Sequence, residues 1–150
     1  MLRYLITLVL AIAGFIAQTQ EVLYLSNGSN ITITPGAILT VQGGLQLANG
    51  SSISNDGNLY LNNNSISNQS NWTDNNVTGV FSALSTGMVY FQSANGHTIT
   101  GNTIFPSLTL DAVNEGATIN NSISIANNLI LKNGKFNTGS FQLIALNNAV

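Results

Sequence analysis

The chain has 150 residues, of which 44% are hydrophobic and only 5% are charged, whereas an ordinary soluble domain has about 25% charged residues. Three basic and five acidic residues give a net charge of -2, which excludes a basic surface for phosphates, and we expect no nucleic-acid partner. Cysteine is absent, which excludes disulfides, thiolate metal sites and cysteine nucleophiles.

Residues 1–20 have the pattern of a signal peptide. Arg3 precedes an apolar run from Tyr4 to Ala17, and polar residues follow it, as in exported proteins. The run is shorter than the roughly 20 residues that span a bilayer, so we expect no retained membrane span. The sequence therefore predicts a secreted or cell-surface protein with one mature domain at residues 21–150.

Beyond residue 20, apolar and polar residues alternate with a period of two in many short segments, which predicts β-strands. In chain order these segments are VLYL, ITIT, LTVQ, LQL, LYL, MVYF, TIT, LTL, SISI, LIL and FQL. Between them lie Asn-Gly, Pro-Gly, Gly-Gly, Asp-Gly and Asn-Asn pairs, which favour turns. No segment has helical spacing, so an all-β domain is expected.

A strand of the form Leu-x-Leu followed by Asn or Gly recurs along the chain. Copies begin at Leu23, Leu45, Leu59 and Leu129, with weaker copies at Leu108 and Ile144. The separation is 22 residues from Leu23 to Leu45, 14 from Leu45 to Leu59, 21 from Leu108 to Leu129 and 15 from Leu129 to Ile144. Such repetition is typical of stacked repeat proteins.

These repeats predict a parallel β-helix, or β-solenoid, in which equivalent side chains of successive coils lie over one another. Six leucines are expected to point inward: Leu45, Leu47, Leu59, Leu61, Leu129 and Leu131. Asparagine is expected at the corners, where its amide forms ladders and its backbone tolerates left-handed geometry. The alternative is an antiparallel β-sandwich, which also has many short strands and is favoured by hairpin signals such as Asn27-Gly28.

Few residues are candidates for chemistry. His97 is the single histidine, and without a neighbouring ligand or triad partner we expect it to be a turn or surface residue. The five acidic residues are expected mainly in turns, although a coil could bring some together for acid and base catalysis: Glu21, Asp56, Asp74, Asp111 and Glu115. No residue is assigned to catalysis, to a cofactor or to a metal ion.

Trp72 and two threonine tracts admit a binding function. The Trp72 indole would either stack on a sugar ring or cover an end of the core. The tracts ITIT from Ile31 and TIT from Thr98 would order water as ice-binding proteins do, but they are far apart in the chain, which disfavours this hypothesis.

The segment from Asn71 resembles a recurrent part of secreted Bacteroidetes-type surface proteins. The matching stretches are NWTDNN from Asn71, GMVYF from Gly87, HTITG from His97 and IFPSLTL from Ile104. The family pattern commonly has Gln where this chain has His97. The resemblance implies a β-helix or adhesin-like protein of the type exported by the type IX secretion system.

On this resemblance we expect a non-enzymatic structural spacer or adhesin-like scaffold at the cell surface, with surface glycans or other surface proteins as partners. No sorting domain follows Val150, so residues 21–150 are expected to be a domain truncated at its C-terminus, whose uncapped end would promote self-association. The alternative is a carbohydrate-binding or polysaccharide-cleaving β-helix.

Overall fold

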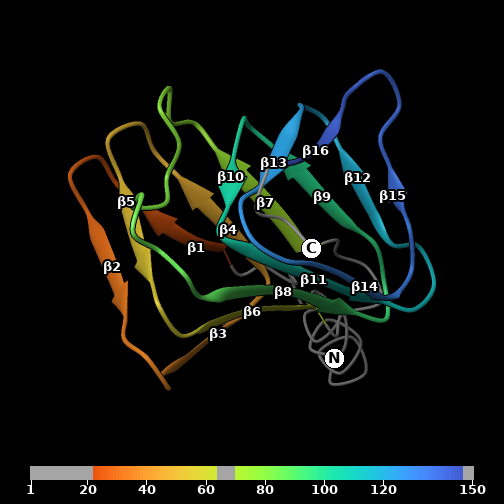
Figure 1. Cartoon of the computed structure of the whole chain (residues 1–150), viewed down its shortest axis with the longest axis horizontal. Coiled ribbons are helices and arrows are strands. Elements are labelled where there is room, and N and C mark those ends of the chain that lie inside the picture. The colour runs from red at the N-terminus through yellow and green to blue at the C-terminus, as the bar shows by residue number, and fades with distance from the viewer. Residues whose placement is uncertain (1–21, 64–69, 147–150) are drawn as a thin grey trace, which may run out of the picture.

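The computed structural model describes residues 22–63 and 70–146 (Figure 1). In these residues the structure contains sixteen β-strands and no helix. The predicted signal peptide at residues 1–20, and Glu21, lie outside the described residues. The expectation of an all-β fold is confirmed for the described residues.

The strands form three faces. The first sheet has six strands, β1 (Val22–Leu25), β4 (Gly44–Leu47), β7 (Ser70–Asp74), β9 (His97–Thr100), β12 (Ala117–Ile119) and β15 (Phe136–Asn137). The second sheet has five, β3 (Ile38–Gln42), β6 (Asn58–Asn63), β8 (Met88–Ser93), β11 (Ser107–Ala112) and β14 (Leu129–Asn133). The third face consists of β2 (Asn30–Ile33) with β5 (Ser52–Asn55), and of β10 (Ile104–Phe105), β13 (Ile123–Ile125) and β16 (Leu143–Ala145).

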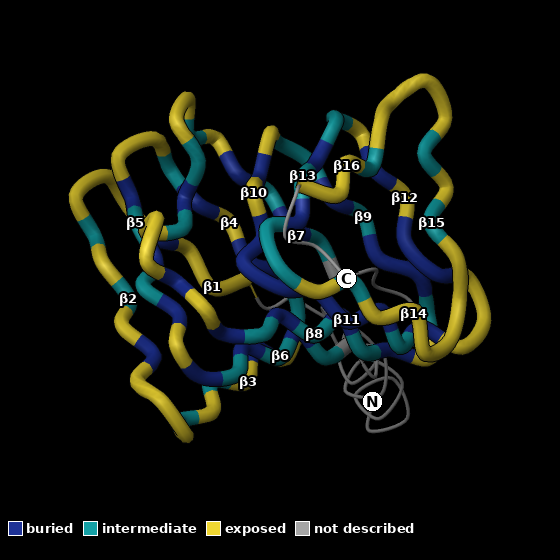
Figure 2. Tube along the Cα trace, in the orientation of Figure 1, coloured by how far each residue is buried: buried dark blue, intermediate teal, exposed yellow. Residues whose placement is uncertain are grey.

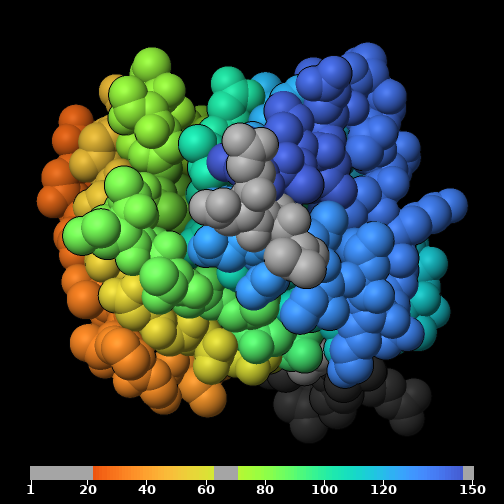
Figure 3. Space-filling model, viewed as in Figure 1, coloured from red at the N-terminus to blue at the C-terminus, as the bar shows by residue number. Residues whose placement is uncertain are grey.

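Every pair of neighbouring strands in these sheets is parallel. The chain passes through the three faces in turn and then begins the next coil, so that the six strands of the first sheet mark six stacked coils. Figures 1 and 3 show the coils following one another from the N-terminal side of the domain to the C-terminal side. The β-solenoid is thereby confirmed, and the antiparallel sandwich is wrong.

The strand register explains the unequal spacing of the Leu-x-Leu repeats. Leu23 pairs with Leu45, and Leu108 pairs with Leu129, so separations of 22 and 21 residues each correspond to one full coil. Leu45 lies on the first sheet and Leu59 on the second. The separation of 14 residues is therefore the step from one face to another within a single coil.

The core consists of the inward-facing side chains of all three faces (Figure 2). Four of the six leucines expected inside are fully buried: Leu45, Leu47, Leu59 and Leu61. Leu129 is only half-buried, and Leu131 is 55% exposed. Leu131 lies in the same inner column as its fully buried register partner Leu110. It is exposed because, among the described residues, β14 is the terminal strand of its sheet.

The corners differ from the expected arrangement in one respect. Among the described residues, every residue with positive φ is a glycine, as at Gly28 (φ 77°) and Gly134 (φ 89°). Asparagine thus does not adopt left-handed backbone geometry here. Its amide instead bonds to neighbouring coils: Asn114 Nδ2 donates to the Ala94 carbonyl at 2.7 Å, and Gly101 N donates to Asn121 Oδ1 at 2.9 Å. Asparagine therefore stabilises the corners through its side chain.

Candidate functional site

The four acidic residues within the described ranges each bond to a neighbouring coil rather than to one another. At the corner between β5 and β6, Asp56 Oδ1 accepts hydrogen bonds from the Thr86 backbone and hydroxyl, both at 3.1 Å. Glu115 Oε2, in the turn after β11, accepts one from Gly96 N at 3.2 Å. Both partners lie roughly one coil away in the chain, so these carboxylates join successive coils. The prediction that Asp56 and Glu115 lie in turns is confirmed.

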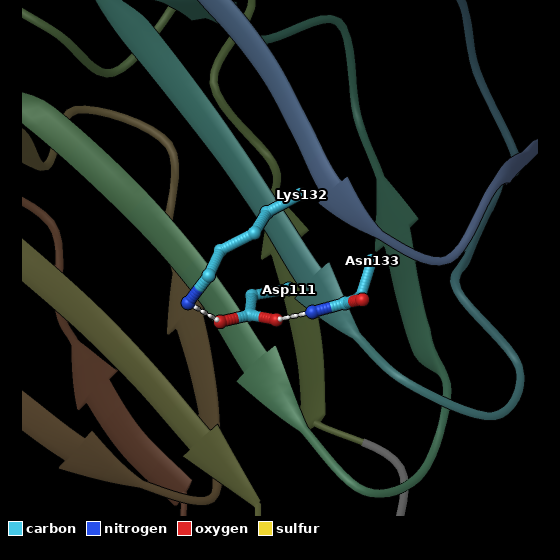
Figure 4. A network of polar contacts seen from close by, with 3 residues as sticks. All are labelled: Asp111, Lys132 and Asn133. Carbon is cyan, nitrogen blue, oxygen red and sulfur yellow. Dashed lines mark hydrogen bonds and ion pairs between the residues drawn. The ribbon is translucent and has the colours of Figure 1, made fainter.

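Asp111 lies near the end of strand β11, just before the turn at residues 113–115 that it was expected to flank (Figure 4). Its Oδ2 atom forms an ion pair with Lys132 Nζ at 2.8 Å, and its Oδ1 atom accepts a hydrogen bond from Asn133 Nδ2 at 2.6 Å. Both partners are on β14 in the next coil. The hydrogen bonds from Asn133 and Lys132 hold the pKa of Asp111 below its usual value, and the carboxylate raises the pKa of Lys132.

Asp74 was expected in a loop, but it is the last residue of β7 and is buried. Asp74 Oδ2 accepts a hydrogen bond from Thr103 Oγ1 at 2.8 Å, and Thr103 accepts one from Trp72 Nε1 at 2.8 Å. The other oxygen, Oδ1, accepts bonds from the backbone and amide nitrogens of Asn76 at 3.0 and 2.9 Å. Asn76 Oδ1 in turn accepts from Gly50 N at 2.8 Å.

This Asp74 network, comprising Trp72, Asp74, Asn76, Thr103 and Gly50, extends from the core to the surface across three coils. Thr103 and Trp72 are fully buried. Polar groups at such depth are costly unless they are hydrogen-bonded, and each of these has a partner. The network therefore satisfies buried polar atoms and fixes the spacing of the coils.

Trp72 and His97 are both in the core. The Trp72 indole has no exposed surface and packs with Phe81, Phe91 and Phe105 at centroid distances of 5.6, 6.4 and 5.1 Å. It therefore neither stacks on a sugar nor covers an end of the core. His97 is the first residue of β9, is 2% exposed, and its ring is nearly perpendicular to the Phe91 ring, with centroids 5.1 Å apart. The expectation of a turn or surface histidine was wrong.

The outer face of the second sheet carries a stacked pair of tyrosines. Tyr60 on β6 and Tyr90 on β8 are in register and half-exposed, and their rings stack with centroids 4.2 Å apart and planes 6° apart. Burial raises the pKa of Tyr90 above its ordinary value, and the neighbouring Tyr60 raises it further. Beside this pair runs a polar column of Gln42, Asn62, Gln92 and Asp111, which are paired in register.

The arrangement offers little for catalysis. Within the described ranges, no group of three His, Cys, Asp or Glu residues lies close enough to hold a metal ion. A groove of about 780 Å³ between the loop at residues 83–86 and strand β16 is lined by uncharged residues, among them Leu84, Ile144 and Leu146. It supplies no acid or base. In the part of the chain that the structure describes, no helix has the length and apolar character to cross a membrane.

Sequence reasoning identified neither Thr103, nor the Tyr60–Tyr90 pair, nor the polar column. Thr103 lies about one coil along the chain from Trp72 and Asp74, and neighbouring residues of the pair and of the column are likewise about one coil apart. Aligning the sequence at the coil spacing, rather than at the Leu-x-Leu repeats, would have placed Tyr60 beside Tyr90. Comparisons with known proteins find no matching family model, no matching curated protein and no matching solved structure.

Proposed function

We propose that the chain is a non-enzymatic β-solenoid module that acts as a structural spacer or adhesive scaffold on the outside of a bacterial cell. The observation that carries this proposal is the use made of the ionisable side chains. Asp56, Asp74, Asp111 and Glu115 all bond to neighbouring coils, so the four carboxylates within the described residues have structural roles.

The architecture and the sequence both support a scaffold role. In a stacked-coil protein each coil contacts only its neighbours, which gives an elongated body with broad lateral faces for contact. The signal-peptide pattern of residues 1–20 supports export. The stretches from Asn71 to Leu108 that resemble secreted Bacteroidetes-type surface proteins support a surface location.

An assay for polysaccharide cleavage tests the non-enzymatic part of the proposal. The purified chain is incubated with a panel of neutral and acidic polysaccharides, and the release of reducing ends is measured. We expect no release above that of a heat-denatured sample. Release that disappears in Asp111→Asn but persists in Asp56→Asn, a matched carboxylate at a corner, would contradict the proposal and identify a catalytic acid.

The Tyr60–Tyr90 pair favours glycan binding as the adhesive activity. Tyrosine faces and adjacent amide groups are suited to sugars, which have apolar ring faces and many hydroxyls. Tyr90→Ala should abolish binding on a glycan array, whereas Tyr24→Ala, which removes the exposed tyrosine of β1, should retain it. Equal binding by both variants would exclude this surface as the glycan site.

Self-association through the end coils is a further part of this proposal. Leu23 and Leu131 continue the inner columns of the buried residues Leu45 and Leu110, yet they are 37% and 55% exposed. A coil of a second copy stacked on either end would bury them and would pair the free strand edges. The contact would be head to tail and thus open-ended.

A further inference from the structure

Two columns of hydroxyl and amide side chains run across the outer face of the first sheet. The first column consists of Asn71, Thr98, Thr118 and Asn137, which are paired in register on β7, β9, β12 and β15. The second consists of Gln46, Thr73, Thr100 and Asn120. Asn120 continues this column because its amide donates to Thr100 Oγ1 at 3.3 Å and its backbone nitrogen to Ile99 O at 2.8 Å.

We call these eight residues the threonine–asparagine face. The tracts ITIT and TIT, which are far apart in the chain, lie on different faces of the solenoid. Thr32 of the first tract is on the third face, where its register partner is Ser54. Thr98 and Thr100 of the second tract lie at the centre of the threonine–asparagine face (Figure 1, strand β9). The neighbours that complete the array come from other coils.

The geometry of parallel strands makes this face a two-dimensional array. Neighbouring strands are about 4.8 Å apart, and alternate residues along one strand are about 6.6 Å apart. On the inner side of the same strands, Trp72, Ile99 and Ile119 are buried in the core with at most 2% exposure. Packing from behind holds the strands in place, so the outer side chains keep regular spacing.

The chemical character of the face narrows the ligand class. All eight side chains are uncharged and non-aromatic. Gln46, Thr118, Asn120 and Asn137 are exposed, the other four are half-buried, and the Oδ1 atom of Asn71 is buried. Nucleic acids and anionic surfaces require basic residues, and stacking on sugar rings requires aromatic ones. None of the eight residues is basic or aromatic, and the nearest aromatic side chain in the second column is Tyr24 at its β1 edge, in register with Gln46. Hydroxyl and amide groups at regular intervals, with threonine methyl groups between them, suit a solid whose surface repeats hydrogen-bonding positions over similar distances. Ice is such a solid.

We propose that the threonine–asparagine face binds the surface of ice. This inference goes beyond the scaffold function and does not depend on the Tyr60–Tyr90 surface. The array fixes positions for water molecules through its hydroxyls and amides, and the core behind it keeps the strands in register. Its low charge removes the strongly hydrated groups that would hold disordered water against the face.

The test measures how much of the full chain enters a growing ice shell from dilute solution. Wild-type protein should be incorporated well above a non-binding globular protein of similar size. Thr100→Tyr places a bulky side chain at the centre of the face, and we expect about tenfold lower incorporation, equivalent to roughly 1.4 kcal/mol of binding free energy. The matched control is Thr32→Tyr, on the third face, which should be incorporated like wild type.

Two further measurements make the result decisive. Thermal unfolding of each variant establishes that it is folded, since tyrosine is well tolerated in strands. Binding to insoluble cellulose and chitin above freezing identifies a polysaccharide ligand. Wild-type incorporation no greater than that of the non-binding protein, equal incorporation of Thr100→Tyr and wild type, or polysaccharide binding that Thr100→Tyr abolishes would each overturn the proposal.

Discussion

At the scale of single residues, burial depends on position along the stack more than on residue type. Leu110 and Leu131 occupy the same inner column in neighbouring coils, but the first is fully buried and the second is 55% exposed. The difference arises because Leu110 has strands on both sides, β8 and β14, whereas β14 itself has a neighbour on one side only. The two leucines form a natural matched pair.

Replacing each of them with alanine tests this explanation. Leu110→Ala removes a buried side chain between two coils and should lower the free energy of unfolding by about 3 kcal/mol. Leu131→Ala should lower it by less than about 1 kcal/mol. Denaturant unfolding of both variants measures the difference. Equal losses of unfolding free energy would contradict the explanation that Leu131 is exposed because it lies at the end of the inner column.

Thr103 is the residue on which the Asp74 network depends. Thr103→Val keeps the shape of the side chain but leaves Trp72 Nε1 and Asp74 Oδ2 without a bond that each makes in the native protein. Because unpaired buried polar groups cost about 1–3 kcal/mol each, we expect a loss of about 3 kcal/mol in thermal or denaturant unfolding. Thr32→Val, at an exposed site, should change stability by no more than about 0.5 kcal/mol; similar losses for the two would argue against the network.

The pKa of Asp111 predicts a pH-dependent contribution to stability. The pKa is lowered in the folded state, so the folded protein favours the carboxylate, and the contribution is present above the ordinary pKa of about 4. It is lost as the pH falls through the lowered folded pKa. Wild type should therefore be slightly more stable than Asp111→Asn at pH 6 and lose this advantage in acid. The effect is small because Lys132 is largely exposed. An advantage that persisted in strong acid would contradict the assignment.

At the scale of elements, sequence periodicity predicted the apolar strands and missed the polar ones. Strands β1, β3 and β8 are rich in apolar residues and were found. Strand β7, with the sequence SNWTD, and strand β12, with ATI, were not. Their local preference for strand is weak. They form strands because each pairs with a strand of the preceding coil and a strand of the following coil. The same non-local pairing explains why the burial of Trp72 and His97 could not be predicted: their surroundings come from other coils.

The corner glycines test how closely successive coils approach. Gly28 and Gly116 both have φ of +77°, but a Cβ on Gly28 meets no atom within 4 Å, whereas one on Gly116 would overlap the backbone of Lys135 in the next coil. Gly28→Ala should cost about 1–2 kcal/mol from backbone geometry alone. Gly116→Ala should cost clearly more, because the coils must also separate. Equal melting temperatures for the two variants would show that the coils are not in close contact at this corner.

At the scale of the whole molecule, the six coils of the described residues share one continuous core, and Leu23 and Leu131 in the first and last strands of their sheets are exposed. If the ends associate as proposed, sedimentation of the full chain should show species that grow with concentration. Leu131→Asp should reduce this association without unfolding the protein, because the side chain is already mostly exposed. Tyr24→Asp places the same charge on β1, at the other end of the stack, and its self-association is compared with that of Leu131→Asp. Association that is unchanged in Leu131→Asp would place the contact elsewhere.

The central claim is that neighbouring coils run parallel and in register, and cross-linking tests it most directly. The chain has no cysteine, so Thr32→Cys combined with Ser54→Cys introduces a single pair at positions that are partners on β2 and β5. Their backbones should lie about 5 Å apart, within the range that a disulfide spans. We predict nearly complete intramolecular disulfide formation on oxidation, detected by peptide mass mapping, and none in the control pair Thr32→Cys with Thr40→Cys, whose positions lie on different faces. Failure of the first pair to cross-link in a folded protein, or equal cross-linking of both pairs, would contradict the stacked parallel coils.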